Sequence, residues 1–291
     1  DQLFMIKTAK NLGLKVITID QNINSPGFKI SDEFEVISTR DLPKIFNFLD
    51  HKKREGLKIN GVSTMGSDIP QYVAQIANYL NSPSISLQSA LWATNKYEMK
   101  KRFEKYNVNT PKYAKANSLK EFRKLINNFK YPLIVKPVDQ AGSKGVSLVR
   151  EPKDSENLFI NALKNSNNGD VIIEEFIKGP QISTESIILN GKIYTPGYAD
   201  RNYESLENFL PQIMENGGLV PSQYQSNKKE VEREILKASK SLDIDNGVVK
   251  GDVVLSKNGP YIIEIAARLS GGDFSESLVP IGTGVNYVET V

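Results

Sequence analysis

The segment from Gly251 to Gly272 reads GDVVLSKNGPYIIEIAARLSGG, and it holds two short apolar runs that each carry one carboxylate. Asp252 stands among valines and Glu264 among isoleucines, in runs whose length and composition are typical of strands. The residues between the runs, Lys257 to Pro260, form a strong turn signal. The segment therefore predicts an antiparallel hairpin with one acid on each strand.

The position of the turn decides whether the two acids meet. A two-residue loop of Asn258-Gly259 would be closed by the backbone N–H of residue 260, and Pro260 has none. We therefore expect a five-residue loop, residues 256–260, with Leu255 facing Tyr261. Counting back in twos then places the two acids directly opposite each other on one face, with Cβ atoms roughly 4.5 to 5.5 Å apart.

This pair of carboxylates predicts a metal site. Two acids so close in apolar surroundings repel each other unless one is protonated or a cation lies between them. With no Cys or His nearby, the pair suits Mg²⁺ or Mn²⁺, which takes one or two carboxylates and completes its shell with phosphate oxygens and water. Arg268, four residues beyond Glu264, could offer its fork of N–H donors to the same phosphate. An acid at each end of an exposed hairpin is the alternative reading.

The composition indicates an ordinary globular protein of two or three units. The chain has 291 residues, of which 39% are hydrophobic and 24% charged. With 37 basic and 34 acidic residues its net charge is +3, so we expect no nucleic-acid partner. No apolar run approaches the length of a membrane span, and we expect no membrane partner.

The chain has no Cys and a single His, which excludes several kinds of site. Disulfides, thiolate metal sites, Cys nucleophiles and His-based triads cannot be built from it. His51 lies in the polar string DHKKREG and is interpreted as a solvated surface residue. The composition is compatible with a cytoplasmic location.

Residues 1–92 alternate helical and strand patterns, which predicts a Rossmann-like parallel sheet covered by helices. We expect helices at 5–13, 42–56 and 69–80, and strands at 15–20 and 59–66. Asp20, Ser67 and Asp68 fall at strand ends, where such sheets bind ligands. No strand precedes the first helix, so the opening strand is expected to be missing. Without a glycine-rich turn there, NAD binding has no support.

The next unit offers cationic and flexible groups for an anion. A basic helix at 95–107 is followed by strands at 112–116, 131–137, 146–149 and 170–177 and helices at 118–129 and 154–165. Lys136 stands inside an apolar strand, where an ammonium is costly, so it should face an anion in a cleft. Gly142-Ser143-Lys144-Gly145 could form a lid over phosphates, although a polar hairpin turn explains it as well.

A polar-to-apolar switch, Glu174-Glu175-Phe176-Ile177, ends the last of these strands. Exposed backbone groups beside apolar side chains could hold a flat heterocycle such as adenine, and a charged strand end is the alternative. A hairpin follows at 181–201 and a charged helix at 227–242. Asp200, Arg201 and Glu215 lie in loops that could reach a substrate, and a plain salt bridge explains them equally well.

Taken in order, these segments resemble the ATP-grasp superfamily, in particular its carboxylate-amine ligases. The resemblance rests on the lysine-bearing helix, YPLIVKP, GSKGV, VIIEEFI and the terminal D(x11)E(x3)R that runs into RLSGG. It implies a mixed α/β and α+β fold in three parts. These are a Rossmann-like domain at 1–92, an ATP-grasp N-terminal subdomain with the linker helix and glycine loop at 93–178, and a C-terminal subdomain with the metal site at 179–291.

The resemblance also assigns roles to residues. It implies that Lys96 and Lys136 contact the ATP phosphates and that Ser143, Lys144 and Gly145 close over them. It further implies that the adenine hinge is formed by Glu174, Glu175, Phe176 and Ile177. The divalent cations would be held by Asp252 and Glu264. Arg268 resembles the arginine that steadies the transferred phosphoryl group, so Arg268 and Lys136 are the predicted catalytic residues.

Three features depart from the family pattern. Gln181 stands where a glutamate usually binds the ribose hydroxyls, and it keeps an acceptor but loses the charge. Ala266 stands where the family often has Asn. The family also usually continues well past Val291, so the C-terminus is expected to be truncated.

The resemblance implies an ATP- and Mg²⁺-dependent ligase that activates a small carboxylic acid as an acyl phosphate and joins it to an amine. Activation of bicarbonate, as in carboxylases and carbamoyl-phosphate synthesis, is one alternative. A non-catalytic ATP-binding module is another, suggested by Gln181 and Ala266. The expected partners are the small acid and amine substrates, and a homodimer is left open.

Overall fold

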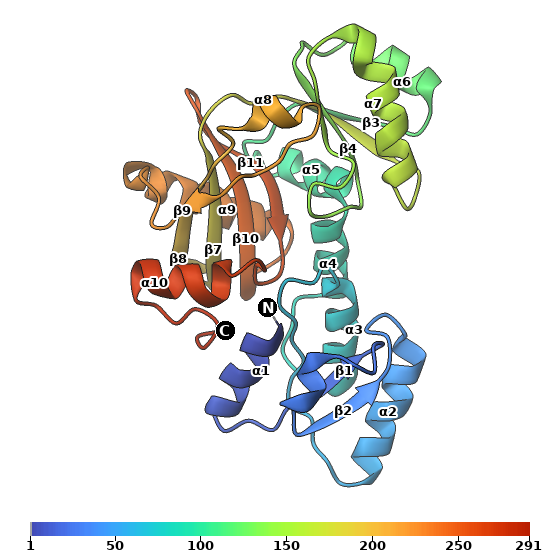
Figure 1. The fold of residues 1–291 in the computed structure, drawn as a ribbon, viewed down its shortest axis with the longest axis vertical. Coiled ribbons are helices and arrows are strands. Elements are labelled where there is room, and N and C mark those ends of the chain that lie inside the picture. Colours follow the sequence, from blue (N-terminus) through green and yellow to red (C-terminus); the bar gives the residue numbers. More distant parts are fainter. Residues whose placement is uncertain (1) are drawn as a thin grey trace.

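The computed structural model describes residues 2–291 and contains three separate sheets, joined by helices (Figure 1). A two-stranded sheet lies near the bottom of Figure 1, a four-stranded sheet at the top, and a five-stranded sheet at the left. Helices α4 (Leu87–Thr94) and α5 (Lys96–Lys105) rise between the first part and the other two. The mixed α/β and α+β class predicted from the sequence is confirmed.

The first part contains a parallel sheet of β1 (Ile17–Asp20) and β2 (Glu33–Val36). Its other elements are α1 (Gln2–Asn11), the 3-10 turn η1 (Pro26–Lys29), α2 (Leu42–Arg54) and α3 (Pro70–Leu80), so the three predicted helices form. Apolar faces of α2 and α3 pack together around Ile45, Leu49 and Ile76.

The strand predicted at 59–66 is wrong, because this segment joins neither β1 nor β2. Its last residues pair with the far end of the chain instead. Met65 forms a parallel bridge with Leu269, and the Gly66 N–H donates to the Leu269 carbonyl at 3.1 Å. This long-range pairing provides hydrogen-bond partners for backbone groups that would otherwise need a neighbouring strand. It also holds the first part of the chain against the segment that follows the hairpin.

The four-stranded antiparallel sheet has the order β3-β6-β4-β5. Its strands are β3 (Tyr113–Ala116), β4 (Leu133–Pro137), β5 (Ser147–Val149) and β6 (Val171–Glu175), and helices α6 (Leu119–Ile126) and α7 (Pro152–Asn165) cover it. Stacked rings of Phe122 and Phe159, 4.5 Å between centroids, join the two helices over the sheet. The sheet thereby fixes β4 and β6, which carry Lys136 and Glu174.

The five-stranded antiparallel sheet has the order β11-β10-β7-β8-β9. Its strands are β7 (Gln181–Leu189), β8 (Lys192–Arg201), β9 (Gly218–Leu219), β10 (Gly247–Ser256) and β11 (Gly259–Ala266). The remaining elements of this part are α8 (Leu206–Phe209), η2 (Gln225–Asn227), α9 (Lys228–Ser241), the π turn η3 (Phe274–Leu278) and α10 (Val279–Thr283). Helix α9 buries Val231, Ile235 and Ala238 against the sheet. The opposite face carries the two acids of the hairpin.

The β10–β11 hairpin turns more tightly than the sequence predicts. Ser256 pairs with Gly259 and Leu255 with Pro260, so the loop is only Lys257-Asn258 and the predicted five-residue loop is wrong. Gly259 takes the closing position, where an N–H is needed. Pro260 falls one position further, on an edge strand, where its missing N–H removes no ladder hydrogen bond.

A β-bulge then restores the expected pairing of the acids. The tight turn alone would place Ile263 opposite Asp252 and send Glu264 to the other face of the sheet. The register shifts by one residue between Asp252 and Val253, and Asp252 faces Glu264. The predicted juxtaposition is therefore confirmed, although by a different route.

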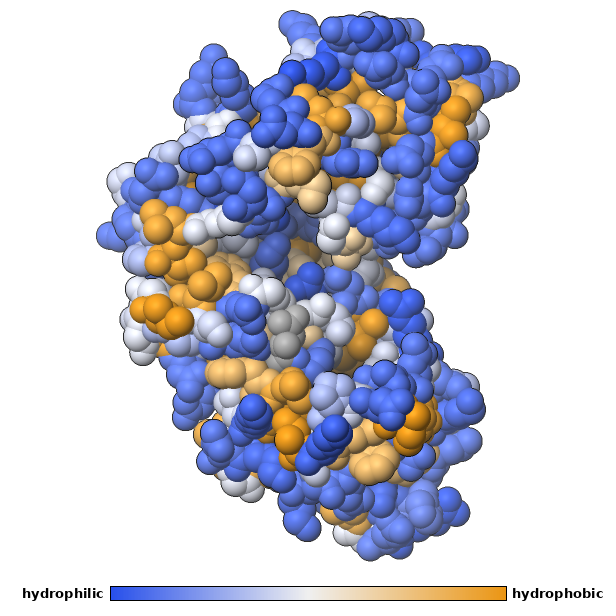
Figure 2. All heavy atoms as spheres, in the orientation of Figure 1, coloured by the Kyte–Doolittle hydropathy of each residue, from blue (hydrophilic) through white to orange (hydrophobic). Residues whose placement is uncertain are grey.

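Apolar side chains also reach the surface near the end of the chain. Leu278 and Ile281 are exposed, and Figure 2 shows hydrophobic atoms gathered over the region of α10. Among residues 2–291, no helix combines the length and the apolar character needed to cross a membrane.

Candidate active site

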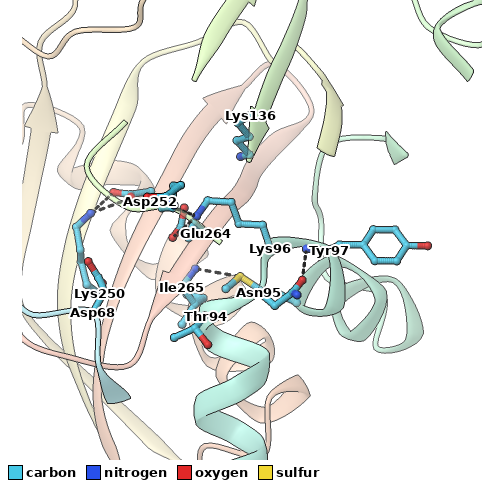
Figure 3. A network of polar contacts seen from close by, with 12 residues as sticks. Asp68, Thr94, Asn95, Lys96, Tyr97, Lys136, Lys250, Asp252, Glu264 and Ile265 are labelled. Atoms are coloured by element: carbon cyan, nitrogen blue, oxygen red, sulfur yellow. Dashed lines mark hydrogen bonds and ion pairs between the residues drawn. The ribbon is translucent and has the colours of Figure 1, made fainter. Parts of the chain in front are cut away.

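Both acids of the hairpin are already paired with cationic side chains (Figure 3). Lys250 Nζ lies 2.7 and 2.8 Å from the two carboxylate oxygens of Asp252, and Arg201 Nη1 lies 2.9 Å from Oδ1. Glu264 Oε1 lies 3.3 Å from Lys96 Nζ. The two carboxylates therefore share one face of the sheet with three cations, a concentration of charge that a plain surface hairpin would not need.

The charges around Asp252 keep it ionised. Burial would raise the pKa of this carboxyl, but Lys250 and Arg201 hold the pKa well below its ordinary value. Burial likewise opposes the charge of Arg201, and Asp252 together with Glu215 raises the pKa of this guanidinium. Asp252 is thus a carboxylate throughout the neutral range.

Lys250 was not predicted from the sequence, and the role of Arg201 was left undecided. Lys250 precedes Asp252 by two residues, so the period of a strand places both on one face, and this signal could have identified it. Arg201 ends β8 and pairs with Gln181 at the start of β7, and its side chain reaches Asp252 on β10 and forms an ion pair with Glu215. This contact depends on the order of the strands in the sheet, which the spacing of residues along the sequence does not reveal.

Lys96 connects the hairpin with the start of the glycine loop. Asn95 caps α5, because its side chain accepts hydrogen bonds from the N–H groups of Tyr97 and Glu98, each at 3.1 Å. Lys96, the first residue of the helix, is buried and donates from Nζ to the Gln140 carbonyl at 2.6 Å. The same ammonium pairs with Glu264, so one cation touches both walls of the site.

The glycine loop is an exposed turn between β4 and β5. Gly142, Ser143 and Gly145 all have positive φ angles, of 62°, 58° and 72°. Lys144 and its neighbours in the turn face solvent. At Gly145 the backbone passes so close to β4 and α7 that a Cβ would lie 2.9 Å from Pro137 Cγ and 2.9 Å from Asn165 Cβ. The loop can therefore present free N–H groups and one ammonium to an anion.

Lys136 faces an anion, as its burial predicts, and that anion is Glu174. Lys136 Nζ lies 2.8 Å from Glu174 Oε2, and both side chains are nearly inaccessible to solvent. Lys100 of α5 is the third member of this cluster, with Nζ 3.5 Å from Glu174 Oε1. The carboxylate of Glu174 is thus engaged inside the protein, and only its backbone and the residues after it remain for a base.

The segment after Glu174 connects the four-stranded to the five-stranded sheet. Glu175 is exposed and ends β6, while Phe176 and Ile177 are half-buried in the connection. A Cβ on Gly179 would lie 2.0 Å from the Leu255 carbonyl oxygen, and the Leu255 N–H donates to the Pro180 carbonyl at 2.8 Å. Gln181 begins β7 and is half-buried. The segment is therefore fixed against β10 while its apolar side chains stay partly open.

Arg268 is held by the first part of the chain. Its Nε lies 2.5 Å from Asp68 Oδ1, and its Nη1 donates to the Leu269 carbonyl at 3.1 Å. A small pocket opens beside this pair, and its lining includes Asp68, Lys96, Gln140, Glu264, Ala266 and Arg268. Asp20 does not line this pocket, and Ser67 accepts a hydrogen bond from the Gln2 amide at 3.2 Å.

The donor set fits a hard cation only in part. Within the described part of the chain, no group of three or more His, Cys, Asp or Glu side chains is placed to hold a metal ion. Asp252 and Glu264 provide two carboxylates on one face. This is the number of protein ligands that Mg²⁺ commonly takes when phosphate oxygens and water complete its shell.

Comparison with known proteins identifies the family of this chain. Residues 93–272 match the ATP-grasp domain. The chain is 25% identical over 297 residues to phosphoribosylamine–glycine ligase of Methanococcus vannielii, covering 94% of this chain and 66% of that protein. It is 23% identical over 278 residues to the carbamoyl phosphate synthase large chain of Clostridium beijerinckii, covering 91% of this chain and 24% of that protein. The chain therefore spans less than two thirds of the length of these relatives.

Solved structures show the same fold. An L-amino acid ligase from Bacillus licheniformis aligns with a TM-score of 0.82 and 24% identity, covering 98% of this chain and 69% of that one. A phosphoribosylglycinamide synthetase from Anaerococcus prevotii aligns with a TM-score of 0.74 and 25% identity, covering 99% of this chain and 70% of that one. The matched domain occupies more than half of the chain, and the protein belongs to the ATP-grasp family.

Proposed function

We propose that this protein is an ATP- and Mg²⁺-dependent ligase that activates a small carboxylic acid as an acyl phosphate and joins it to an amine. The observation that carries the proposal is the meeting of Lys96, Glu264 and Arg268 around one pocket. Lys96 begins α5, while Glu264 and Arg268 lie in and just after β11, and together they provide cations for phosphates and a carboxylate for a metal ion. The relatives named as ligases support the same reaction class.

Each group has a role in binding the nucleotide. Lys96 and Lys136 bind phosphate oxygens, residues 143–145 cover them, and residues 174–177 hold the adenine, with Gln181 at the ribose. Asp252 and Glu264 hold Mg²⁺ or Mn²⁺, which supplies neutralisation of the phosphate charge when bound. Lys250 and Arg201 keep Asp252 ionised and oriented for that task.

The chemistry requires little from the protein beyond position and charge. A carboxylate oxygen of the acid attacks the γ-phosphorus of ATP, the bond to the β–γ bridging oxygen breaks, and ADP leaves. The amine then attacks the acyl carbon, phosphate leaves with the bonding pair, and the amine loses a proton. Arg268 offers its guanidinium to the transferred phosphoryl group. Phosphoryl transfer is helped mainly by positioning and electrostatics, which suits a site without His or Cys.

Activation of bicarbonate is the second candidate. It is favoured by the match with the carbamoyl phosphate synthase large chain. In that case the intermediate would be carboxyphosphate instead of an acyl phosphate. The same cationic side chains and metal ion would neutralise the phosphate charge.

A screen of phosphate release separates these functions. Amino acids and small carboxylic acids are tested in pairs with ATP and Mg²⁺, and product mass is measured. We expect release with specific pairs and a product of the summed mass less water. Release that requires labelled bicarbonate and carries the label into product would select the second candidate. ATP binding by calorimetry without release with any acid would indicate a non-catalytic module and contradict both.

The glycine loop offers a separate test of the nucleotide site. Gly145→Ala adds a Cβ that overlaps Pro137 and Asn165, and overlap of this kind costs roughly 1–3 kcal/mol. We expect the KM for ATP to rise about tenfold as the loop is displaced. Gly142→Ala is the matched control: it also has positive φ, but nothing lies within 4 Å of its Cβ. Equal KM values for the two variants would show that the loop does not cover ATP.

A further inference from the structure

Lys100, Glu174 and Lys136 form a buried ion triad that joins three elements. Their exposed fractions are 0%, 1% and 4%, and they come from α5, β6 and β4. The carboxylate is shared: Oε2 lies 2.8 Å from Lys136 Nζ and Oε1 lies 3.5 Å from Lys100 Nζ. A buried charge is strongly unfavourable without partners, so the orientation of each side chain depends on the other two.

Lys100 also ties this triad to the hairpin that carries the acids. Its Nζ donates to Thr110 Oγ1 at 2.6 Å and to the Ile262 carbonyl at 3.3 Å. Thr110 Oγ1 in turn donates to the same carbonyl at 2.9 Å. Ile262 precedes Glu264 by two residues on β11. One ammonium thus connects the four-stranded sheet, which holds Lys136, with the strand that holds Glu264.

We propose that Lys100 is a positioning residue for the nucleotide: it holds one oxygen of Glu174, so that the other oxygen fixes Lys136 where ATP phosphates bind. This inference rests on the proposed function, in which Lys136 contacts the nucleotide. Lys100 itself is fully buried and does not line the pocket. It acts on ATP only through Glu174 and Lys136.

The charge of Lys100 is sensitive to mildly alkaline pH. The pKa of Lys100 is lowered to about 8: burial is the main cause and Lys136 adds to it, while Glu174 and Glu264 act in the opposite direction. Lys96 is the other cation that acts on Glu174. Above that pH, Lys100 loses its proton, and Glu174 keeps only Lys136 as a close cationic partner. Binding of an anionic nucleotide should then become weaker, because it must pull a proton back onto Lys100.

The test measures ATP binding by calorimetry with Mg²⁺ and without an acid substrate. For Lys100→Met we expect the Kd to rise about 10- to 100-fold, the loss typical when a residue that orients a ligand-binding group is removed. Lys101→Met is the matched control, because Lys101 is the next residue on the same helix but is exposed and pairs with Glu98. Its Kd should equal that of the unchanged protein.

A pH series distinguishes positioning from a merely structural role. Between pH 7 and 9.5 the Kd of the unchanged protein should be flat below about pH 8 and then rise by up to about tenfold per pH unit. The Lys100→Met protein should lose this rise. A folded Lys100→Met protein with an unchanged Kd would overturn the proposal. If that variant does not fold, a flat profile of the unchanged protein overturns it instead. If the unchanged protein binds no ATP at all, the proposed function fails.

Discussion

Glu264→Gln is expected to reduce ATP-dependent phosphate release by roughly 10²- to 10³-fold, the loss typical for removing one charge-stabilising group from an active site. The substitution removes one of the two hairpin carboxylates and leaves Lys96 Nζ without its carboxylate partner. The Glu264 side chain is 27% exposed, so the amide can be solvated and the fold should persist. Activity is measured with the acid and amine found in the screen, and folding by circular dichroism.

Glu230→Gln is the control for this result, because Glu230 lies beside the turn of the same hairpin, near Gly259. It is not placed in the site, and its rate should stay within about twofold of the unchanged protein. Near-normal ADP formation by Glu264→Gln would show that the hairpin does not hold the metal ion.

Glu174→Gln is expected to lower the free energy of unfolding by about 3–5 kcal/mol, the typical cost of removing one partner from a buried ion pair. It leaves the ammonium groups of Lys100 and Lys136 buried without the carboxylate between them. Urea unfolding at pH 7 measures the loss. Glu98→Gln, which removes the exposed partner of Lys101, should change stability by no more than about 0.5 kcal/mol.

The loss in Glu174→Gln should become smaller as the pH rises. The folded protein already lowers the pKa of Lys100 to about 8, and removing Glu174, which raises that pKa, lowers it further. Above this pKa the unfolded chain binds more protons than the folded one, so stability increases with pH. Unfolding curves at pH 7 and pH 9 test the sign. A deficit that is the same or larger at pH 9 would show that removing Glu174 does not lower the pKa of Lys100 in the folded protein.

The hairpin shows how far local sequence patterns reach. Apolar runs of strand length located both strands, and the turn residues located the reversal. The predicted loop length was wrong because the two-residue loop that was considered, Asn258-Gly259, would need an N–H at Pro260. The actual loop, Lys257-Asn258, places Pro260 where its missing N–H affects no partner. The acids meet through a bulge at Ile263, and nothing in the order of apolar residues predicts one extra residue in a strand.

The site shows the same division between local and long-range information. Lys136, Glu264 and Arg268 were identified because a charge in an apolar run, or at a fixed spacing from another charge, is a local signal, whereas Lys96 was assigned through the family resemblance. Lys100 was missed because a helical lysine among other lysines resembles a solvated face. Only the packing of α5 between the two larger sheets makes its ammonium a buried one.

By itself, the sequence determined most of the segments that form helices and strands, the shared face of the two acids in the hairpin, and the family that the chain resembles. These depend on side-chain periodicity and turn chemistry over a few residues. The tertiary structure alone decided that residues 59–66 leave the first sheet to pair with Leu269, that Asp68 holds Arg268, and that Glu174 is shared between two lysines. Each of these joins segments far apart in the chain, where the pairing of backbone groups and buried charges is set by the whole fold.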